Sequence, residues 1–324
     1  MIYLNENDLT RIGYKWGNII EVLESAARSL CSGQFSQPLK PYLRFNNPRN
    51  RIIAMPAYVG GDISTAGIKW IASFPENPSK GMARAHSTVI LNDSDTGIPY
   101  AIINTALLSV IRTVGVSGLF LKAIESYRSM KEMTVGIVGL GPIGINHLSF
   151  LLDQYGDRIK EIMVFDIDPL KIQQAQALAT GGVVVSAAES WEEAYRFADL
   201  FITCTVASAP YISLEPKPGS IHLNVSLRDY GSEVYPWFKN GIVVDDWDEV
   251  CREGTAIERF HQSNGLNKED VVDLKGMFSG QALEKIGSNE TVIFNPMGMA
   301  IFDIAVGHYF YHAAEQQSVG VKME

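Results

Sequence analysis

The sequence predicts an α/β protein in which a doubly wound parallel-sheet domain is inserted into a discontinuous α+β domain. Three observations predict this class. A glycine-rich turn follows an apolar strand near the middle of the chain, at residues 134–144. After it, apolar runs alternate with helix-compatible stretches, which is typical of parallel sheets with crossover helices. Before it, several strand-like runs are separated by glycine, asparagine and proline, which is typical of an antiparallel sheet.

The first part of the chain contains one clear helix and four strand-like runs. Apolar residues at helical spacing predict a helix over 17–32, with Gly33 as its stop. The strand-like runs cover 51–59, 65–74, 87–91 and 100–103. A long apolar segment at 105–124 then predicts a buried helix that leads to the inserted domain.

The central motif is an apolar strand that ends in Gly-x-Gly-x-x-Gly and is followed by a helix-compatible stretch at 145–152. Gly139 permits the turn, Gly141 lets backbone N–H groups approach a pyrophosphate, and Gly144 lets the helix pack closely on the strand. These features are the fingerprint of a Rossmann domain that binds a dinucleotide. The expected cofactor contacts from this loop are Gly139, Gly141, Pro142, Ile143 and Gly144.

Asp166 completes the fingerprint at the end of the next apolar run, about 20 residues further on. Its carboxylate can accept hydrogen bonds from the ribose hydroxyls of NAD and would repel the 2′-phosphate of NADP. A basic residue nearby could restore NADP binding, and Lys171 is the close candidate. The motif therefore favours NAD as the cofactor.

The alternation of helices and strands continues to the end of the inserted domain. Helices are expected over 169–179 and 191–197, and strands over 183–185, 199–205, 220–225, 241–244 and 291–294. The stretch 246–285 is helical and loop-rich in pattern, and a final amphipathic helix is expected over 301–316. We expect two domains: residues 1–113 plus 300–324 form the substrate-binding and dimerisation domain, and residues 114–299 form the NAD-binding domain. Ligands bind at the carboxyl ends of strands in such sheets. Cofactor contacts are therefore also expected from Cys204, Thr205, Val225 and Ser226.

Composition limits the class of partner. The 324 residues carry a net charge of −9, which argues against nucleic acid or an anionic membrane as the main partner. Cys31, Cys204 and Cys251 are odd in number, far apart and without metal-ligand spacing, which indicates reduced thiols in a cytoplasmic protein and no metal site. The first residues lack the cationic head of a signal peptide. The apolar segment 105–124 contains charged residues and glycines, so it is too polar for a membrane span.

The candidates for chemistry lie outside the glycine loop. Arg112 interrupts an apolar helix, where a guanidinium needs an anionic partner. Either it forms an internal salt bridge, or its planar fork holds a substrate carboxylate. Lys69 has the same two interpretations. Asp229 follows a strand end and is either a turn-capping residue or a carboxylate that relays a proton.

The histidines are mostly interpreted as structural. His147, in the fingerprint helix, is expected to be a packing or surface residue, and His222, within an apolar strand, a core histidine with satisfied ring nitrogens. His86 leads into a strand of the substrate domain and remains a candidate for substrate binding.

Seven short motifs are spread along the chain: Arg51 to Pro56, Gly67-Ile68-Lys69, Val89 to Asp93 with Thr96-Gly97, Arg112-Thr113, Gly139-x-Gly141, Asn224 with Asp229, and Gly298-x-Ala300-x-x-Asp303. Taken together, these motifs resemble the ornithine cyclodeaminase/μ-crystallin family. The resemblance covers nearly the whole chain and implies a homodimer that forms through the first domain. Where this chain has Ile143-Gly144, the family commonly has Gln-Ala.

The resemblance also implies roles for individual residues. Arg44, Lys69 and Arg112 would hold the substrate carboxylate, with Met55, His86 and Gly298 also assigned to the substrate site. Asp229 would be the acid/base residue, with Lys69 as a second proton shuttle. Thr113 would lie near the nicotinamide or the phosphates.

A closer likeness involves residues 37–44, 67–71, 77–80 and 295–300. They resemble the branch that makes L-2,3-diaminopropionate for siderophores such as staphyloferrin B. Its members oxidise N-(2-amino-2-carboxyethyl)-L-glutamate with NAD and hydrolyse the imine to 2-oxoglutarate and 2,3-diaminopropionate. Between Arg44 and Lys69 the one acid is Asp62, and two further arginines add positive charge. This balance suits a substrate with three carboxylates better than the second ammonium of ornithine.

Two other classes of function stay open. One is a related reaction, such as that of ornithine cyclodeaminase, alanine dehydrogenase or a ketimine reductase. The other is ligand binding without turnover, as in μ-crystallin.

Overall fold

The computed structural model describes residues 1–47, 49–279 and 286–324, which divide into two compact units. Unit 1 comprises Met1–Val116 and Gly298–Glu324, and unit 2 comprises Ser117–Met297. The sequence predicted boundaries after residue 113 and before residue 300. The observed boundaries fall a few residues away, and the first of them lies within the helix α3 (Leu107–Glu125).

Unit 1 is built on a mixed sheet with the strand order β16-β1-β7-β6-β5-β4-β2, and β3 pairs with β4 outside that path. Its strands are β1 (Ile2–Asn5), β2 (Phe35–Ser36), β3 (Tyr42–Leu43), β4 (Arg51–Val59), β5 (Thr65–Ser73), β6 (Ala85–Asp93), β7 (Pro99–Asn104) and β16 (Val321–Lys322). The sequence predicted an antiparallel sheet, and the four long strands β4 to β7 do pair in that way. The short strand β1 was not predicted, and it runs parallel to β7.

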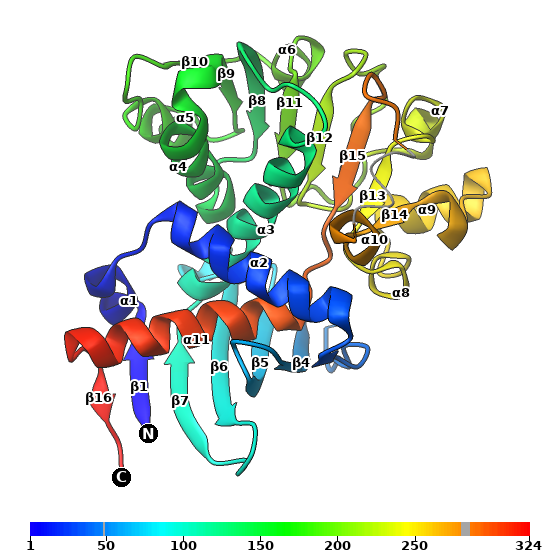
Figure 1. Cartoon of the computed structure of the whole chain (residues 1–324). Helices are drawn as coiled ribbons and strands as arrows, with labels where there is room; N and C mark the ends of the chain where they lie inside the picture. The colour runs from blue at the N-terminus through cyan, green and yellow to red at the C-terminus, as the bar shows by residue number, and fades with distance from the viewer. Residues whose placement is uncertain (48, 280–285) are drawn as a thin grey trace. The chain divides into compact units, whose positions relative to one another are not determined.

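The helices of unit 1 are α1 (Glu6–Ile12), α2 (Trp16–Ser32) and α11 (Ala300–Gln317), with the first part of α3. α11 packs against β4, β5, β6 and α2, so these elements enclose the core of the unit (Figure 1). The predicted helix over 17–32 is confirmed, and Gly33 ends it in the left-handed conformation with a φ of 74°. The final helix was predicted to be amphipathic, but its first eight residues are all buried.

Unit 2 is a doubly wound sheet of parallel strands in the order β10-β9-β8-β11-β12-β15-β13-β14. The strands are β8 (Met133–Val138), β9 (Ile159–Phe165), β10 (Val184–Ala187), β11 (Leu200–Thr203), β12 (Ile221–Asn224), β13 (Ile242–Val244), β14 (Val272–Asp273) and β15 (Val292–Asn295). The strand order reverses between β8 and β11, which is the point where such sheets bind their ligands. The predicted fold class is confirmed.

The helices of unit 2 follow its strands. They are α4 (Pro142–Tyr155), α5 (Pro169–Gln176), α6 (Trp191–Arg196), α7 (Tyr235–Phe238), α8 (Trp247–Val250), α9 (Ala256–Asn264) and α10 (Leu274–Phe278). In Figure 1, α4 and α5 accompany the β8–β10 side of the sheet. The stretch expected to be helical and loop-rich contains α8 to α10 and the unpredicted strand β14, and its last part, 280–285, lies outside the described residues.

The segment that was predicted to be too polar for a membrane span forms α3, and that prediction was wrong on composition: α3 is the one helix among the described residues that is long and apolar enough to cross a membrane. However, 67% of its most apolar window is buried inside the protein. Burial to this extent is what a core helix requires.

Candidate active site

The glycine loop after β8 has the close backbone packing that its sequence predicts. Gly139 has a φ of 90°, and a Cβ added there would lie 2.7 Å from the carbonyl carbon and oxygen of Cys204. A Cβ at Gly144 would collide with the carbonyl oxygen of Gly139. In contrast, nothing lies within 4 Å of a Cβ placed on Gly141, which is the N-cap of α4. The loop is therefore tight on its inner side and open at the start of α4, where N–H groups can bind a phosphate.

Asp166 anchors this loop to the end of β9. One carboxylate oxygen accepts a hydrogen bond from the N–H of Leu140 at 2.7 Å, and the other accepts one from the N–H of Asp168 at 3.0 Å. Lys171 lies 3.6 Å from the same carboxylate. A carboxylate can accept further hydrogen bonds beyond these two. Lys171, the candidate partner for a 2′-phosphate, is thus paired with Asp166 itself.

Asp229 lies just past β12 in unit 2, and a strained turn places it there. Leu227 has a φ of 69°, a left-handed conformation that a leucine adopts only at a cost. Asp229 is 1% exposed, and its carboxylate accepts a hydrogen bond from the hydroxyl of Thr205, which lies 2.8 Å from both carboxylate oxygens. The hydroxyl of Tyr211 donates a third contact at 3.2 Å. Neighbouring residues therefore hold the carboxylate in a fixed position.

The environment of Asp229 suits proton transfer. Burial raises the pKa of its carboxyl group, and hydrogen bonds from Ser226, Thr205 and Tyr211 oppose that rise only in part. A carboxyl group with a raised pKa can take up and release a proton closer to neutral pH than an ordinary aspartate. Buried proton-active carboxyl groups of this kind are concentrated in active sites.

The other residues predicted to bind the cofactor lie along the same carboxyl edge of the sheet in unit 2. The hydroxyl of Thr205 is taken by Asp229, and that of Ser226 lies 2.8 Å from the hydroxyl of Thr203. Val225 lies between β12 and Ser226. Burial raises the pKa of the Cys204 thiol, which therefore stays protonated. The structure thus gives Thr205 and Ser226 protein partners in addition to their expected role.

In unit 1, Lys69 and Arg112 share one carboxylate oxygen. The Nζ of Lys69 and the Nε of Arg112 each lie 2.9 Å from Oδ1 of Asp303 on α11. The side chain of Lys69 is 2% exposed, that of Arg112 is 8% exposed and that of Asp303 is fully buried. The second oxygen of Asp303 is also buried and has no hydrogen-bond partner among the described residues. Two cations against one carboxylate leave this group with one positive charge in excess.

The electrostatics of this group follow from burial and from its three charges. Burial acts to raise the pKa of Asp303, but the charges of Arg112 and Lys69 outweigh it and hold that pKa below its usual value. Burial lowers the pKa of Lys69 to about 8, with a further contribution from Arg112. The internal salt bridge, one of the two interpretations that the sequence allowed for Arg112 and Lys69, is therefore present. One further anion would neutralise the positive charge that remains in this group.

Two predicted substrate contacts lie beside these cations. Met55 is buried and is paired with Lys69 in the ladder between β4 and β5. Gly298 has a φ of 94°, and a Cβ there would lie 2.5 Å from Nη1 of Arg112. The guanidinium of Arg112 therefore lies directly against the backbone of Gly298.

The remaining predicted contacts are placed apart from this group. Arg44 is exposed and lies over the ring of Tyr42, 5.4 Å from its centroid. His86 is exposed and occupies an even position in β6, whereas the odd positions pair with Lys69 and face α11. Because side chains alternate along a strand, His86 projects from the opposite face of the sheet. The structure does not bring His86 to Lys69.

Three further predictions concern single side chains. The hydroxyl of Thr113 donates to the carbonyl of Ser109 within α3, 2.8 Å away. His147 is buried, so it is a packing residue, and its Nε2 forms a hydrogen bond with the hydroxyl of Ser117. Burial lowers the pKa of His147 to about 4. His222 is buried between the hydroxyls of Ser220 and Tyr230, as expected of a core histidine.

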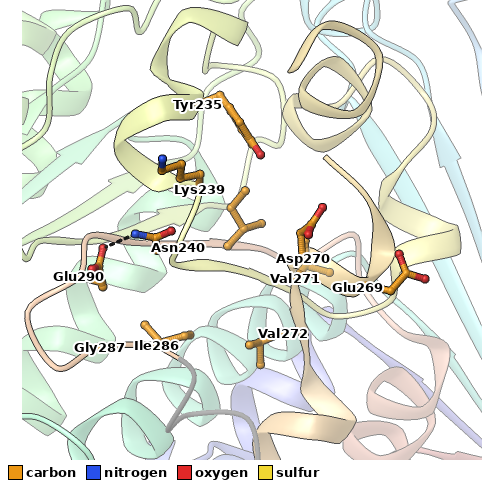
Figure 2. A pocket seen from close by; sticks show the side chains of 11 residues that line it. Tyr235, Lys239, Asn240, Glu269, Asp270, Val271, Val272, Ile286, Gly287 and Glu290 are labelled. Atoms are coloured by element: carbon orange, nitrogen blue, oxygen red, sulfur yellow. Dashed lines mark hydrogen bonds between the residues drawn. The ribbon is translucent and has the colours of Figure 1, made fainter. Parts of the chain in front are cut away.

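A cavity of about 540 Å³ in unit 2 has none of these residues in its lining (Figure 2). It is lined by Tyr235, Lys239, Asn240, Ile242, Glu269, Asp270, Val271, Val272, Ile286, Gly287 and Glu290. Ile242 and Val272 are the first residues of β13 and β14. The cavity is therefore at the amino ends of these strands, and ligands of doubly wound sheets bind at the carboxyl ends.

The glycine loop, Asp166 and Asp229 define a Rossmann-fold protein with a buried carboxyl group of raised pKa at the carboxyl edge of its sheet. The sequence matches the model of the ornithine cyclodeaminase/mu-crystallin family over residues 12–318. The chain belongs to this family.

Its relatives include well-defined dehydrogenases and reductases. The N-((2S)-2-amino-2-carboxyethyl)-L-glutamate dehydrogenase of Staphylococcus aureus is 34% identical, over 100% of this chain and 98% of that protein. The structure is similar to that of Thermococcus litoralis Δ1-pyrroline-2-carboxylate reductase in complex with NADH and L-proline, with a TM-score of 0.87, 25% identity and 100% coverage of both chains. It is also similar to an archaeal alanine dehydrogenase dimer with bound NAD, with a TM-score of 0.86, 25% identity and 100% and 99% coverage.

Proposed function

We propose that this chain oxidises N-(2-amino-2-carboxyethyl)-L-glutamate with NAD⁺ and releases 2-oxoglutarate and L-2,3-diaminopropionate. The chain is an NAD-dependent oxidoreductase of the amino-acid dehydrogenase and reductase kind. The observation that carries the finer proposal is the buried Lys69–Arg112–Asp303 group, which has one positive charge in excess. The 34% identity to the staphylococcal dehydrogenase supports the same substrate. We propose siderophore biosynthesis in the cytoplasm as the setting.

The proposed cofactor fits the residues present. The space at Gly141 leaves the N–H groups at the start of α4 accessible to a pyrophosphate, and Asp166 retains acceptor capacity for a ribose. Cys204, Val225 and Thr113 are proposed as further contacts. When bound, NAD⁺ would supply a hydride acceptor for the carbon that carries the substrate nitrogen.

Unit 1 holds the substrate in this proposal. Lys69 and Arg112 bind one carboxylate of the substrate, whose charge neutralises the excess of the buried group. Met55 and Gly298 lie beside these two cations, and Arg44, which lies over Tyr42, is proposed as a further contact. Fixing the carboxylate fixes the neighbouring carbon, and such positioning supplies much of the rate of a two-substrate reaction.

Asp229 handles the protons. The secondary amine must lose its proton before its lone pair can form the C=N bond as the hydride leaves, and Asp229 accepts that proton. Water then adds to the imine carbon, and its oxygen becomes the ketone oxygen of 2-oxoglutarate. The C–N bond breaks as Asp229 or Lys69 returns a proton to the departing nitrogen, which becomes an amine of 2,3-diaminopropionate.

The face of the unit 1 sheet that lies opposite α11 is a candidate dimer surface. Pro56, Ile68, Ile90 and Ile102 form a row across four strands on that face, and Trp70 on the same face is 44% exposed. An apolar sheet face of this kind requires a partner. We propose a second copy of this chain, in line with the dimer of the archaeal alanine dehydrogenase. Light scattering tests it, and a monomer in solution contradicts it.

The test of the function is to incubate the protein with NAD⁺ and each candidate amine and to follow NADH absorbance. The glutamate conjugate should produce NADH together with equal amounts of 2-oxoglutarate and 2,3-diaminopropionate, whereas alanine and proline should not. An ornithine cyclodeaminase forms proline from ornithine without net NADH, because the hydride returns to the intermediate. Turnover of one of these other amines, or none at all, contradicts the proposal.

A further inference from the structure

The positive charge of this chain is concentrated in one segment. The whole chain has a net charge of −9, but residues 40–86 contain seven lysines and arginines and only two acids, a net charge of +5. This segment includes β3, β4 and β5 and ends within β6. A local reversal of charge on an acidic protein raises the concentration of anions at that place.

Two of these arginines lie over the ring of Tyr42, which belongs to β3. The guanidinium carbons of Arg44 and Arg51 lie 5.4 Å and 5.9 Å from the centroid of the Tyr42 ring. The strand registers place Tyr42, Arg51 and Lys69 on the same face of the sheet. Met55, the strand partner of Lys69, follows Arg51 by four residues. At the usual rise of a strand, Arg51 and Met55 are therefore about 13 Å apart along β4.

Arg84 adds a third guanidinium to this place. The carbonyl of Arg84 accepts a hydrogen bond from the N–H of Phe74 at 2.9 Å, and the residue before Phe74, Ser73, is the strand partner of Arg51. Burial and the positive charge of Arg51 both lower the pKa of Arg84. No ion pair joins Arg51 or Arg84 to a carboxylate in the described part of the chain, and Nε of Arg51 is buried without a hydrogen-bond partner. Nearby Arg49 differs, because it is exposed and lies 3.9 Å from Glu76. Buried donors are rarely left without an acceptor, and like charges rarely gather without an anion.

We propose that Arg51 and Arg84 form a second carboxylate-binding subsite, which selects substrates with more than one carboxylate. The proposal rests on the proposed function, since it assigns the first carboxylate to Lys69 and Arg112. The planar fork of arginine matches a carboxylate with two parallel hydrogen bonds. The distance along β4 separates the two subsites, so one small amino acid cannot fill both, whereas an extended conjugate can reach from one to the other.

The experiment measures binding rather than turnover. Protein loaded with NADH, which cannot accept a hydride, is titrated by calorimetry with N-(2-amino-2-carboxyethyl)-L-glutamate, which has three carboxylates, and with L-alanine, which has one. The variants are Arg51→Gln and, as the matched control, Arg49→Gln, which removes the same charge from an exposed, paired side chain of the same segment.

The wild type should bind the conjugate about 10-fold or more tightly than alanine, as expected for one charge-assisted hydrogen bond. Arg51→Gln should lose this preference and Arg49→Gln should keep it. If Arg51→Gln does not fold, Arg84→Gln takes its place in the same comparison. A wild type without the preference, or an Arg51→Gln that keeps it, overturns the subsite. If the preference behaves as expected but the conjugate yields no NADH, the subsite stands and the proposed function fails.

Discussion

The contact between Gly298 and Arg112 allows a direct test of whether Arg112 holds the substrate. Replacing Gly298 with alanine adds a Cβ that would lie 2.5 Å from Nη1 and 3.0 Å from Nη2 of Arg112. Because these atoms are the far end of a flexible side chain, the guanidinium moves and the backbone does not. The change therefore displaces Arg112 while its charge remains.

Two effects of different size are expected from Gly298→Ala. The φ of 94° costs an alanine about 1–2 kcal/mol of folding stability. Displacing the guanidinium removes a charge-assisted hydrogen bond to the substrate carboxylate, about 1.5–3 kcal/mol, or about 10- to 100-fold in affinity. The first effect lowers the melting temperature, and the second raises KM for the amine substrate.

Gly33→Ala is the matched control. Gly33 also belongs to unit 1 and has a φ of 74°, but nothing lies within 4 Å of its added Cβ. It should show a similar loss of stability with an unchanged KM. The assay is steady-state kinetics with the conjugate, together with NADH binding followed by fluorescence, which should be normal in both variants. If KM in Gly298→Ala equals that of the control, Arg112 does not bind the substrate carboxylate.

Three further predictions concern the other groups. Asp229→Asn should reduce kcat by about 10²-fold or more with normal NADH fluorescence titrations, because the amide cannot take the proton, and full activity would remove Asp229 from the mechanism. The affinity for 2-oxoglutarate, measured by calorimetry, should fall as the pH rises through about 8, because Lys69 is a cation below its pKa and neutral above it; a flat profile up to pH 9.5 contradicts this assignment. Gly144→Ala should lower both the melting temperature and the affinity for NADH, because its Cβ collides with the carbonyl of Gly139. Gly141→Ala should keep the wild-type melting temperature and lose only NADH affinity, and equal melting temperatures in the two variants would contradict the packing argument.

Local patterns predicted much of the fold. The helix over 17–32 was predicted within one residue, since a helical repeat of apolar residues and a terminal glycine are both local signals. β1 and β14 were not predicted, because strands of four and two residues are too short to show a period. The buried first half of α11 was also not predicted, since burial on every side depends on the sheet and helix that enclose it.

The site was predicted only in part, and the main omission is the role of Asp303, which the sequence analysis named in a motif but did not pair with Arg112. The sequence showed that Arg112 needs an anionic partner, and Asp303 is a single acid in the apolar run from Ala300 to Val306. Matching this acid to Arg112, a base within the apolar part of another helix, could have paired them. The position of His86 could not be predicted, because the face that it occupies depends on the register of β6 against β5. Tyr211 belongs to no motif, and only the folded chain brings it to Asp229.

The position of Asp303 late in the chain has a consequence for biosynthesis. A ribosome makes Lys69 and Arg112 early, yet their carboxylate partner belongs to the last segment of unit 1, after all of unit 2 has been made. Unit 2 is continuous in the chain and can fold as it emerges. The nascent first segment must keep two cations hydrated until α11 arrives, so its core closes last.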